Sequence, residues 1–449
     1  MPSRSPASPS SRHGRSRPHS TSTPCSRKRR NRTDNPSKSE HDASIARRVA
    51  DFYQSHPYPA PVDDLQAYRR AWDDARRRAD SHLFFPSQPY RSDRSVLVAG
   101  CGTNQAAHYA VRWPNARVVG IDVSEASVAF ARTLKREHRL DNLELRCHPV
   151  ERATEIDERF DCVVCTGVLH HLADPVAGLR ALRDVLAEGG AMHLMLYAPY
   201  GRTGVYMLQE YCRRLGIDST QAEIDDLTAT LRALPADHPL VPLLRASPDF
   251  SQRAGVADAL LHPRDRAYSV PALFAFLADG GVHFGRWLRQ APYLPDCGAL
   301  AGSPHAARLA ALPAHEAYAA IELFRGTMVR HAVIAYRSSA DASAAAPTFS
   351  GDAWLDYVPL RLPDTIEVRE RLPAGAVAVL INRNHTFTDL YLPIDAARED
   401  LLRRVDGRRT IAQIAGEDRG LARSFFEQLW RWDQVVFDRA AHEAATAGA

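Results

Sequence analysis

SVLVAGCGTNQ, residues 95–105, and VVGID, residues 118–122, are the two stretches that decide the fold. Each contains a short run of apolar, mostly β-branched residues, which is typical of a buried strand. The first run ends in Gly100 and Gly102, which permit a tight turn and a close approach of the backbone to a ligand. The second run ends in an acid, Asp122. The pattern predicts two strands of a nucleotide-cofactor site.

The spacing of these residues suits the phosphate or carboxylate and the ribose of such a cofactor. A helix beginning near Asn104 would direct free N–H groups and the positive end of its dipole toward an anion. Asp122 follows the turn by about 20 residues, where an acid accepts hydrogen bonds from ribose hydroxyls. The dinucleotide pattern G-x-G-x-x-G is not satisfied, because its third glycine is replaced by Gln105.

Two downstream segments indicate which nucleotide cofactor, a dinucleotide or another, this site binds. Residues 160–175 read FDCVVCTGVLHHLADP, and residues 189–197 read GGAMHLMLY. This chain resembles the class I S-adenosylmethionine-dependent methyltransferases, whose fourth strand reads FDxVxxxxVLHHLxDP and whose fifth strand follows a Gly-Gly turn. The resemblance covers residues 90–200 closely and residues 45–340 more loosely.

The resemblance implies that S-adenosylmethionine is the cofactor. In the family's glycine-rich motif, Asn104 takes the place of the third glycine, and asparagine tolerates a positive φ better than most residues. Val98 replaces the usual acid of that motif, and Pro149 replaces the acid that follows the third strand, so that His148 or Glu151 substitutes for it or the adenine is held by packing alone. The residues expected to bind the cofactor are Gly100, Cys101, Gly102, Asn104, Asp122, Val123, Val150 and Thr166.

The order of apolar runs predicts an α/β fold. Strands at 95–99, 117–121, 142–147, 160–165 and 191–197 alternate with helical segments, so they should form a parallel sheet covered on both faces. Val282–Leu288 and His331–Arg337 should close a seven-stranded, Rossmann-like methyltransferase sheet as an antiparallel hairpin. Residues 201–280 are expected to be a helical insertion that builds the substrate pocket.

Four further segments complete the expected organisation. Residues 1–44, rich in Ser, Pro and Arg, should be a disordered basic tail, in which residues 27–30 read as a solvated cluster, a nuclear signal or a nucleic-acid contact. The methyltransferase domain should span residues 45–340, and residues 341–351 should be a linker. Residues 352–449 should form a small winged-helix-like α+β domain that interacts with a protein partner, regulates, or dimerises.

Several side chains are candidates for acceptor binding or catalysis. Tyr53 and Tyr58 precede the sheet, where similar methyltransferases place a cover over the cofactor; anchoring of the N-terminal helix is the alternative. His170 and His171 follow the fourth strand and are either a general base or structural groups under the cofactor. The insertion adds the candidate substrate contacts His262, Arg266 and Tyr268, with a salt bridge of Asp265 as the structural alternative.

Composition narrows the class of function. The first forty residues hold ten basic and two acidic side chains, a net charge of +8, whereas the whole chain carries only +4. The remainder is therefore slightly acidic, which does not favour nucleic-acid binding. Seven cysteines, an odd number, suit a reducing cytoplasm. Cys162 and Cys165 should lie on opposite faces of one strand, so no metal site is expected there.

The expected function is methyl transfer from S-adenosylmethionine to an unidentified small-molecule or protein acceptor. Two alternatives are a degenerate methyltransferase fold that acts as a binding or regulatory protein, and a nucleic-acid methyltransferase guided by the basic tail. No apolar run reaches the ~18 residues that a membrane span needs, so a cytoplasmic protein is expected.

Overall fold

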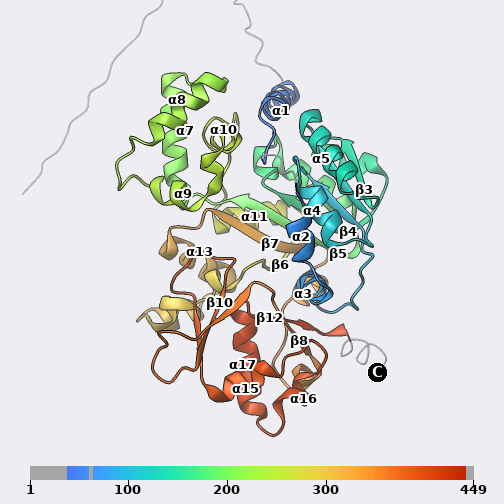
Figure 1. The fold of residues 1–449 in the computed structure, drawn as a ribbon, viewed down its shortest axis with the longest axis vertical. Helices are drawn as coiled ribbons and strands as arrows, with labels where there is room; N and C mark the ends of the chain where they lie inside the picture. The colour runs from blue at the N-terminus through green and yellow to red at the C-terminus, as the bar shows by residue number, and fades with distance from the viewer. Residues whose placement is uncertain (1–37, 60–63, 441–449) are drawn as a thin grey trace, which may run out of the picture.

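The computed structural model describes residues 38–59 and 64–440, and Figure 1 shows their arrangement. The expectations for residues 1–37, with the basic cluster at 27–30, and for residues 441–449 lie outside this part of the chain. Helix α1 spans Lys38–Ser55. The expected boundary at residue 44 is therefore wrong, because the helix continues toward the N-terminus beyond it. None of the described helices is both long and apolar enough to cross a membrane.

A seven-stranded sheet with the order β3-β2-β1-β4-β5-β7-β6 forms the centre of the molecule. Strands β1 to β5 are parallel, and β7 runs antiparallel to both β5 and β6. This confirms the Rossmann-like methyltransferase sheet. The strands are β1 (Val96–Ala99), β2 (Val118–Asp122), β3 (Leu143–Cys147), β4 (Phe160–Thr166), β5 (Leu186–Tyr197), β6 (His283–Trp287) and β7 (Arg330–Tyr336).

Alternate residues of the strands supply the cores on the two faces of the sheet. Leu97 and Cys165 belong to one buried cluster, and Val98 and Cys162 belong to the other. The two cysteines therefore lie on opposite faces, as their spacing predicts. The helices that follow the first strands begin with local caps; for example, the Ser124 hydroxyl accepts the Ser127 N–H at the start of α5. The helices are α4 (Gln105–Arg112), α5 (Glu125–Glu137), α6 (Pro175–Asp184) and α11 (Val270–Gly280).

A helical lobe with its own apolar core follows β5. It lies at one end of the molecule in Figure 1, and Phe52 of α1 contributes to its core. The lobe ends before the expected residue 280, because α11 packs on α6 and buries Leu273 and Leu277 in the core of the sheet. Its helices are α7 (Thr203–Leu215), α8 (Gln221–Leu231), α9 (Val241–Ala246), the short η3 (Pro248–Ser251) and α10 (Arg253–Leu260).

Two connections differ from expectation. Strands β6 and β7 pair as predicted, but the chain between them forms the 3-10 turns η4 (Ala291–Tyr293) and η5 (Gly298–Gly302) and the helices α12 (Ala306–Ala310) and α13 (Ala314–Arg325) instead of a short hairpin turn. The segment expected to be a linker contains helix α14 (Ser339–Ser343). Ala342 and Ala345 are buried in the core of the sheet, so this segment is packed against the domain.

The C-terminal unit lies at the end of the molecule opposite to the helical lobe (Figure 1). Its described residues, up to 440, form a three-stranded sheet, a separate β8–β12 pair and three helices around a core of their own. The winged-helix-like shape stays a prediction. The elements are the short η6 (Ala353–Asp356), β8 (Val358–Arg361), β9 (Thr365–Val368), β10 (Ala378–Asn382), β11 (Leu392–Ile394), α15 (Ala396–Arg403), α16 (Ile411–Ala415), α17 (Arg419–Arg431) and β12 (Val435–Asp438).

Buried contacts join this unit to the sheet domain. Helix α3 (Asp74–Phe84) packs against β8 and β12 and follows α2 (Gln66–Arg70) in the chain. Asp433 accepts a hydrogen bond from Arg286 Nη2 at 3.1 Å. The unit is therefore docked on the sheet domain.

Candidate functional site

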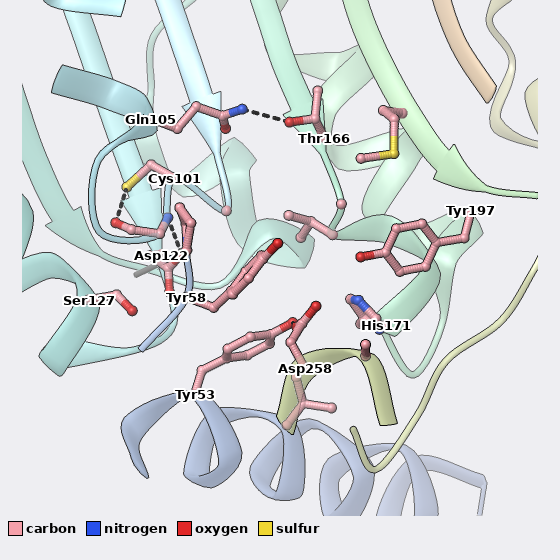
Figure 2. Close-up of a pocket in the computed structure, with 18 of the residues that line it drawn as sticks. Tyr53, Tyr58, Cys101, Gln105, Asp122, Ser127, Thr166, His171, Tyr197 and Asp258 are labelled. Atoms are coloured by element: carbon pink, nitrogen blue, oxygen red, sulfur yellow. Dashed lines mark hydrogen bonds between the residues drawn. The ribbon is translucent and has the colours of Figure 1, made fainter. Parts of the chain in front are cut away.

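A cavity of about 470 Å³ opens at the carboxyl ends of β1, β2, β4 and β5. This is where a parallel α/β sheet binds ligands, and the volume is that of a small-molecule site. The glycine turn after β1 forms one side, and α1, β5 and the helical lobe form the other (Figure 2). All the residues expected to bind the cofactor line it: Gly100, Cys101, Gly102, Asn104, Asp122, Val123, Val150 and Thr166.

The turn after β1 requires its two glycines. Gly100 has φ +69° and Gly102 has φ +54°, a region that side chains disfavour. A Cβ on Gly100 would lie 2.2 Å from Val168 Cγ2, and one on Gly102 would lie 2.4 Å from the carbonyl oxygen of Tyr58. The turn therefore fits closely between the end of β4 and the segment that follows α1.

Asn104 does not have the positive φ expected of a substitute for glycine. Its φ is −144°, and it is the residue that precedes α4. The next residue, Gln105, donates a hydrogen bond from Nε2 to Thr166 Oγ1 at 2.6 Å. This hydrogen bond connects the start of α4 to the end of β4. The dinucleotide pattern, which has a glycine at this position, predicts no such side-chain contact.

Asp122 holds the glycine turn in place. Its carboxylate accepts the Gly102 N–H at 2.8 Å and the Ser124 N–H at 2.9 Å. Burial raises the pKa of Asp122, while these hydrogen bonds act in the opposite direction. The Val123 N–H is a third backbone donor to this carboxylate. Because a carboxylate offers about four acceptor positions, one remains for a hydroxyl of a ribose.

Three adjacent residues follow β3, where the resemblance expects an acid. Pro149, Val150 and Glu151 all line the cavity. The ring of His148 points elsewhere, since its Nε2 pairs with the carbonyl oxygen of Arg152 at 2.8 Å. Burial raises the pKa of Glu151. Glu151 is thus the carboxyl group among these three residues, and the exposed Val123 also lines the cavity.

Tyr53 and Tyr58 line the other side of the cavity. The segment after α1 lies on the glycine turn, where Thr103 Oγ1 donates a hydrogen bond to the carbonyl oxygen of Pro59 at 2.7 Å. The Tyr53 hydroxyl donates to Asp258 Oδ1 of α10 at 2.8 Å. The same segment therefore covers the turn and contacts the helical lobe.

The two histidines after β4 have different surroundings. His171 lines the cavity, and its Nδ1 lies 2.7 Å from the carbonyl oxygen of Arg264. A carbonyl only accepts, so Nδ1 carries the proton and Nε2 offers a lone pair. His170 is fully buried, is not among the described residues that line the cavity, and has a pKa lowered by burial. Of the two histidines, His171 is therefore the one that faces the cavity, and the burial of His170 fits the structural alternative.

The three candidates from the insertion lie outside the described lining of the cavity. Tyr268 is buried in the core of the sheet beside Phe276, and Arg266 is exposed. His262 is buried and stacks on His171 with ring centroids 3.9 Å apart. The role expected for Arg266 and Tyr268 as direct substrate contacts is therefore wrong, and His262 supports His171 from behind.

Asp258, Arg202, Tyr197 and Asp249 line the cavity although no sequence motif marks them. The guanidinium group of Arg202 lies 3.6 Å from the centre of the Tyr197 ring. It also forms a 2.8 Å salt bridge with Asp265, and the side chains of the pair are only 8% and 2% exposed. The alternative reading of Asp265 as a salt-bridge residue is confirmed. Its partner comes from the start of α7, which local spacing does not reveal.

One cluster has donor groups of the kind that metals bind. Candidate ligand atoms of His170, His171 and Asp265 lie within 4.8 Å of one another. The positive charge of Arg202, bonded to the same carboxylate, opposes a cation there. The arrangement fits two histidines beside a buried ion pair better than it fits a metal centre.

Comparison with known proteins agrees with this geometry. A family model described as "Methyltransferase domain" matches residues 96–190. An uncharacterized protein of Synechococcus sp. is 28% identical over 56% of this chain and 62% of its own length. A ubiquinone biosynthesis O-methyltransferase of Acinetobacter baylyi is 34% identical over 32% of this chain and 55% of its own length. The chain thus spans about 55 to 62% of the curated relatives it matches.

Among solved structures, PKMT2 from Rickettsia typhi in complex with AdoHcy shares the fold, with a TM-score of 0.55 and 14% identity over 84% of this chain and 74% of that one. The matched residues include the glycine turn and Asp122 at the end of β2. This part of the chain is therefore similar to an S-adenosylmethionine-dependent methyltransferase domain.

Proposed function

We propose that this protein transfers a methyl group from S-adenosylmethionine to an acceptor that enters between the glycine turn and the helical lobe. The observation that carries the proposal is the hydrogen-bonded unit of Asp122 with the Gly102 N–H at 2.8 Å, which faces a cavity continuous with Tyr53, Tyr58 and Asp258. The cofactor supplies an electrophilic methyl group. The protein supplies the orientation of the acceptor and a group that takes its proton.

Residues on one side of the cavity bind the cofactor, and residues on the other side bind the acceptor. Asp122 binds a ribose hydroxyl with its remaining acceptor position, and Val123 and Val150 pack against the adenine, with Glu151 beside them. The other side holds the acceptor next to His171, whose Nε2 lone pair is directed away from Arg264. Tyr53 of α1 and Asp258 of α10 form part of the wall on this side.

Binding of AdoHcy, measured by calorimetry on the full chain, tests the cofactor half of the proposal. Asp122→Ala should weaken binding at least tenfold, because it removes a charge-assisted hydrogen bond of about 1.5–3 kcal/mol to the ribose. Glu125→Ala is a matched control, since this exposed acid lies near Asp122 at the start of α5. Wild-type protein that is folded and binds no AdoHcy contradicts the proposal.

Transfer of labelled methyl groups separates this proposal from a degenerate binding protein. Val98 and Pro149, at positions where the resemblance expects acids, are the observations that favour the degenerate reading. Protein that binds AdoHcy and transfers no label to small-molecule or protein fractions would support it. The acids Asp249 and Asp258 in the cavity weigh against a nucleic-acid acceptor, because they repel phosphates.

A further inference from the structure

We propose that the methyl acceptor is a primary amine, which enters as an ammonium ion and is bound by the carboxylate of Asp258 among the rings of Tyr53, Tyr58 and Tyr197. This inference rests on the proposed function and specifies its acceptor. The shared chemistry, an alkylammonium group, belongs both to free small amines and to the side chain of lysine in a peptide or protein.

Asp258 is a buried acid with acceptor capacity to spare. It lies on α10, is 5% exposed, and lines the cavity. The Tyr53 hydroxyl donates to its Oδ1 at 2.8 Å. Within residues 38–59 and 64–440 no arginine, lysine or histidine forms a salt bridge with it, and His171 and Arg202 act on its pKa from beyond salt-bridge distance. A buried carboxylate without a cationic partner is costly, so an incoming cation would be stabilised strongly.

Three tyrosines surround this carboxylate. Figure 2 shows the Tyr58 and Tyr197 hydroxyls directed toward the space that Asp258 faces. Burial and the charge of Asp258 raise the pKa of Tyr53, Tyr58 and Tyr197, so the phenols stay protonated and uncharged. Aromatic faces attract ammonium groups, and the hydroxyl oxygens accept their N–H groups.

The other charged residues of the cavity also favour a positively charged ligand. Arg202 is already paired with Asp265 at 2.8 Å, and Arg330, which also lines the cavity, is exposed to solvent. Asp249 adds a second acid beside Tyr58. A carboxylate or phosphate acceptor would be repelled here, and a neutral alcohol would leave the Asp258 charge unpaired.

The reaction balances with the groups present. The ammonium gives one proton to the Asp258 carboxylate, and the freed nitrogen lone pair forms a bond to the methyl carbon. The carbon–sulfur bond of S-adenosylmethionine breaks with its electron pair going to sulfur, which leaves AdoHcy and a methylated ammonium. Asp258 then releases its proton to water. Burial raises the pKa of Asp258 toward that of an amine, which favours the first proton transfer.

The test uses the full chain, methyl-labelled S-adenosylmethionine and four acceptors. Two are amines: n-butylamine, and a peptide with one lysine. The others are n-butanol and the same peptide with norleucine in place of lysine. We expect transfer to one or both amines and none to the controls. A response to n-butylamine alone identifies a small-molecule acceptor, and a response to the lysine peptide alone identifies a polypeptide.

Variants separate this inference from the proposed function. Asp258→Asn should lower amine methylation at least 100-fold and change AdoHcy affinity less than threefold. Tyr58→Phe, which keeps the ring and its packing, should lower it about tenfold. Asp226→Asn, an exposed acid on α8, is the control. Protein that binds AdoHcy but methylates neither amine, or methylates n-butanol, overturns the amine inference alone, whereas absence of AdoHcy binding overturns the proposed function.

Discussion

Removal of the Asp433 carboxylate should destabilise the whole chain. This side chain is fully buried and accepts three hydrogen bonds, from Arg286 Nη2 at 3.1 Å, from the Gln290 N–H at 2.7 Å and from the Ala291 N–H at 2.9 Å. Arg286 is itself 5% exposed. Asp433→Ala therefore leaves a buried guanidinium group without a counter-charge and two backbone donors without an acceptor.

Breaking one partner of a buried ion pair costs about 3–5 kcal/mol, and the loss of the acceptor for two buried N–H groups keeps the cost within that range. We expect Asp433→Ala to lower the free energy of unfolding by about 4 kcal/mol. Asp296→Ala removes a partly exposed partner of Arg431 and should cost about 0–1 kcal/mol. Arg286→Met in the Asp433→Ala background should recover about 2 kcal/mol, because it removes the uncompensated charge.

Urea unfolding followed by circular dichroism measures these differences from the midpoint and slope. A cost for Asp433→Ala within 1 kcal/mol of the cost for Asp296→Ala would refute the reasoning. It would mean that the C-terminal unit is not held on the sheet domain through this pair.

Two further outcomes follow from the same structure. Gly102→Ala should weaken AdoHcy binding at least tenfold, because its Cβ would lie 2.4 Å from the Tyr58 carbonyl oxygen; Gly375→Ala, also at a positive φ but with open space around it, should leave binding unchanged. Two buried histidines should lower stability at low pH, because burial lowers the pKa of His108 to about 4 and of His193 to about 3. Their contribution is complete above the unfolded pKa of about 6.5 and is lost as the pH falls toward 4 to 3, so His108→Gln should make the urea midpoint at pH 5, relative to pH 7, higher than in the wild type; an identical pH dependence contradicts it.

The cofactor side of the site was predictable because its groups are local in the chain. The glycine turn and Asp122 belong to two successive strand ends, which a parallel sheet places at one edge. Short apolar runs likewise predicted the strands, since burial on both faces of the sheet selects them. The positive φ expected for Asn104 was inferred from its place in the glycine-rich motif. Its actual backbone conformation is set by the start of α4, which the preference of asparagine does not reveal.

Other expectations failed where packing at long range decided. Spacing grouped Arg266 and Tyr268 with His262, yet the fold buries Tyr268 under the sheet and leaves Arg266 in solvent. The small residues expected to be a linker pack against the sheet, because Ala342 and Ala345 fit into its core. Composition reports flexibility only when no neighbouring surface is available to bury such residues.

The sequence by itself determined that this chain has a parallel sheet with a glycine turn, an acid at the end of β2 and hence the methyltransferase family. Only the tertiary structure decided what faces that turn. Tyr53, Tyr197, Arg202 and Asp258 come from α1, β5, the start of α7 and α10, and none of them belongs to a local motif. They meet because the helical lobe and α1 share one apolar core, and such packing depends on side chains far apart in the chain.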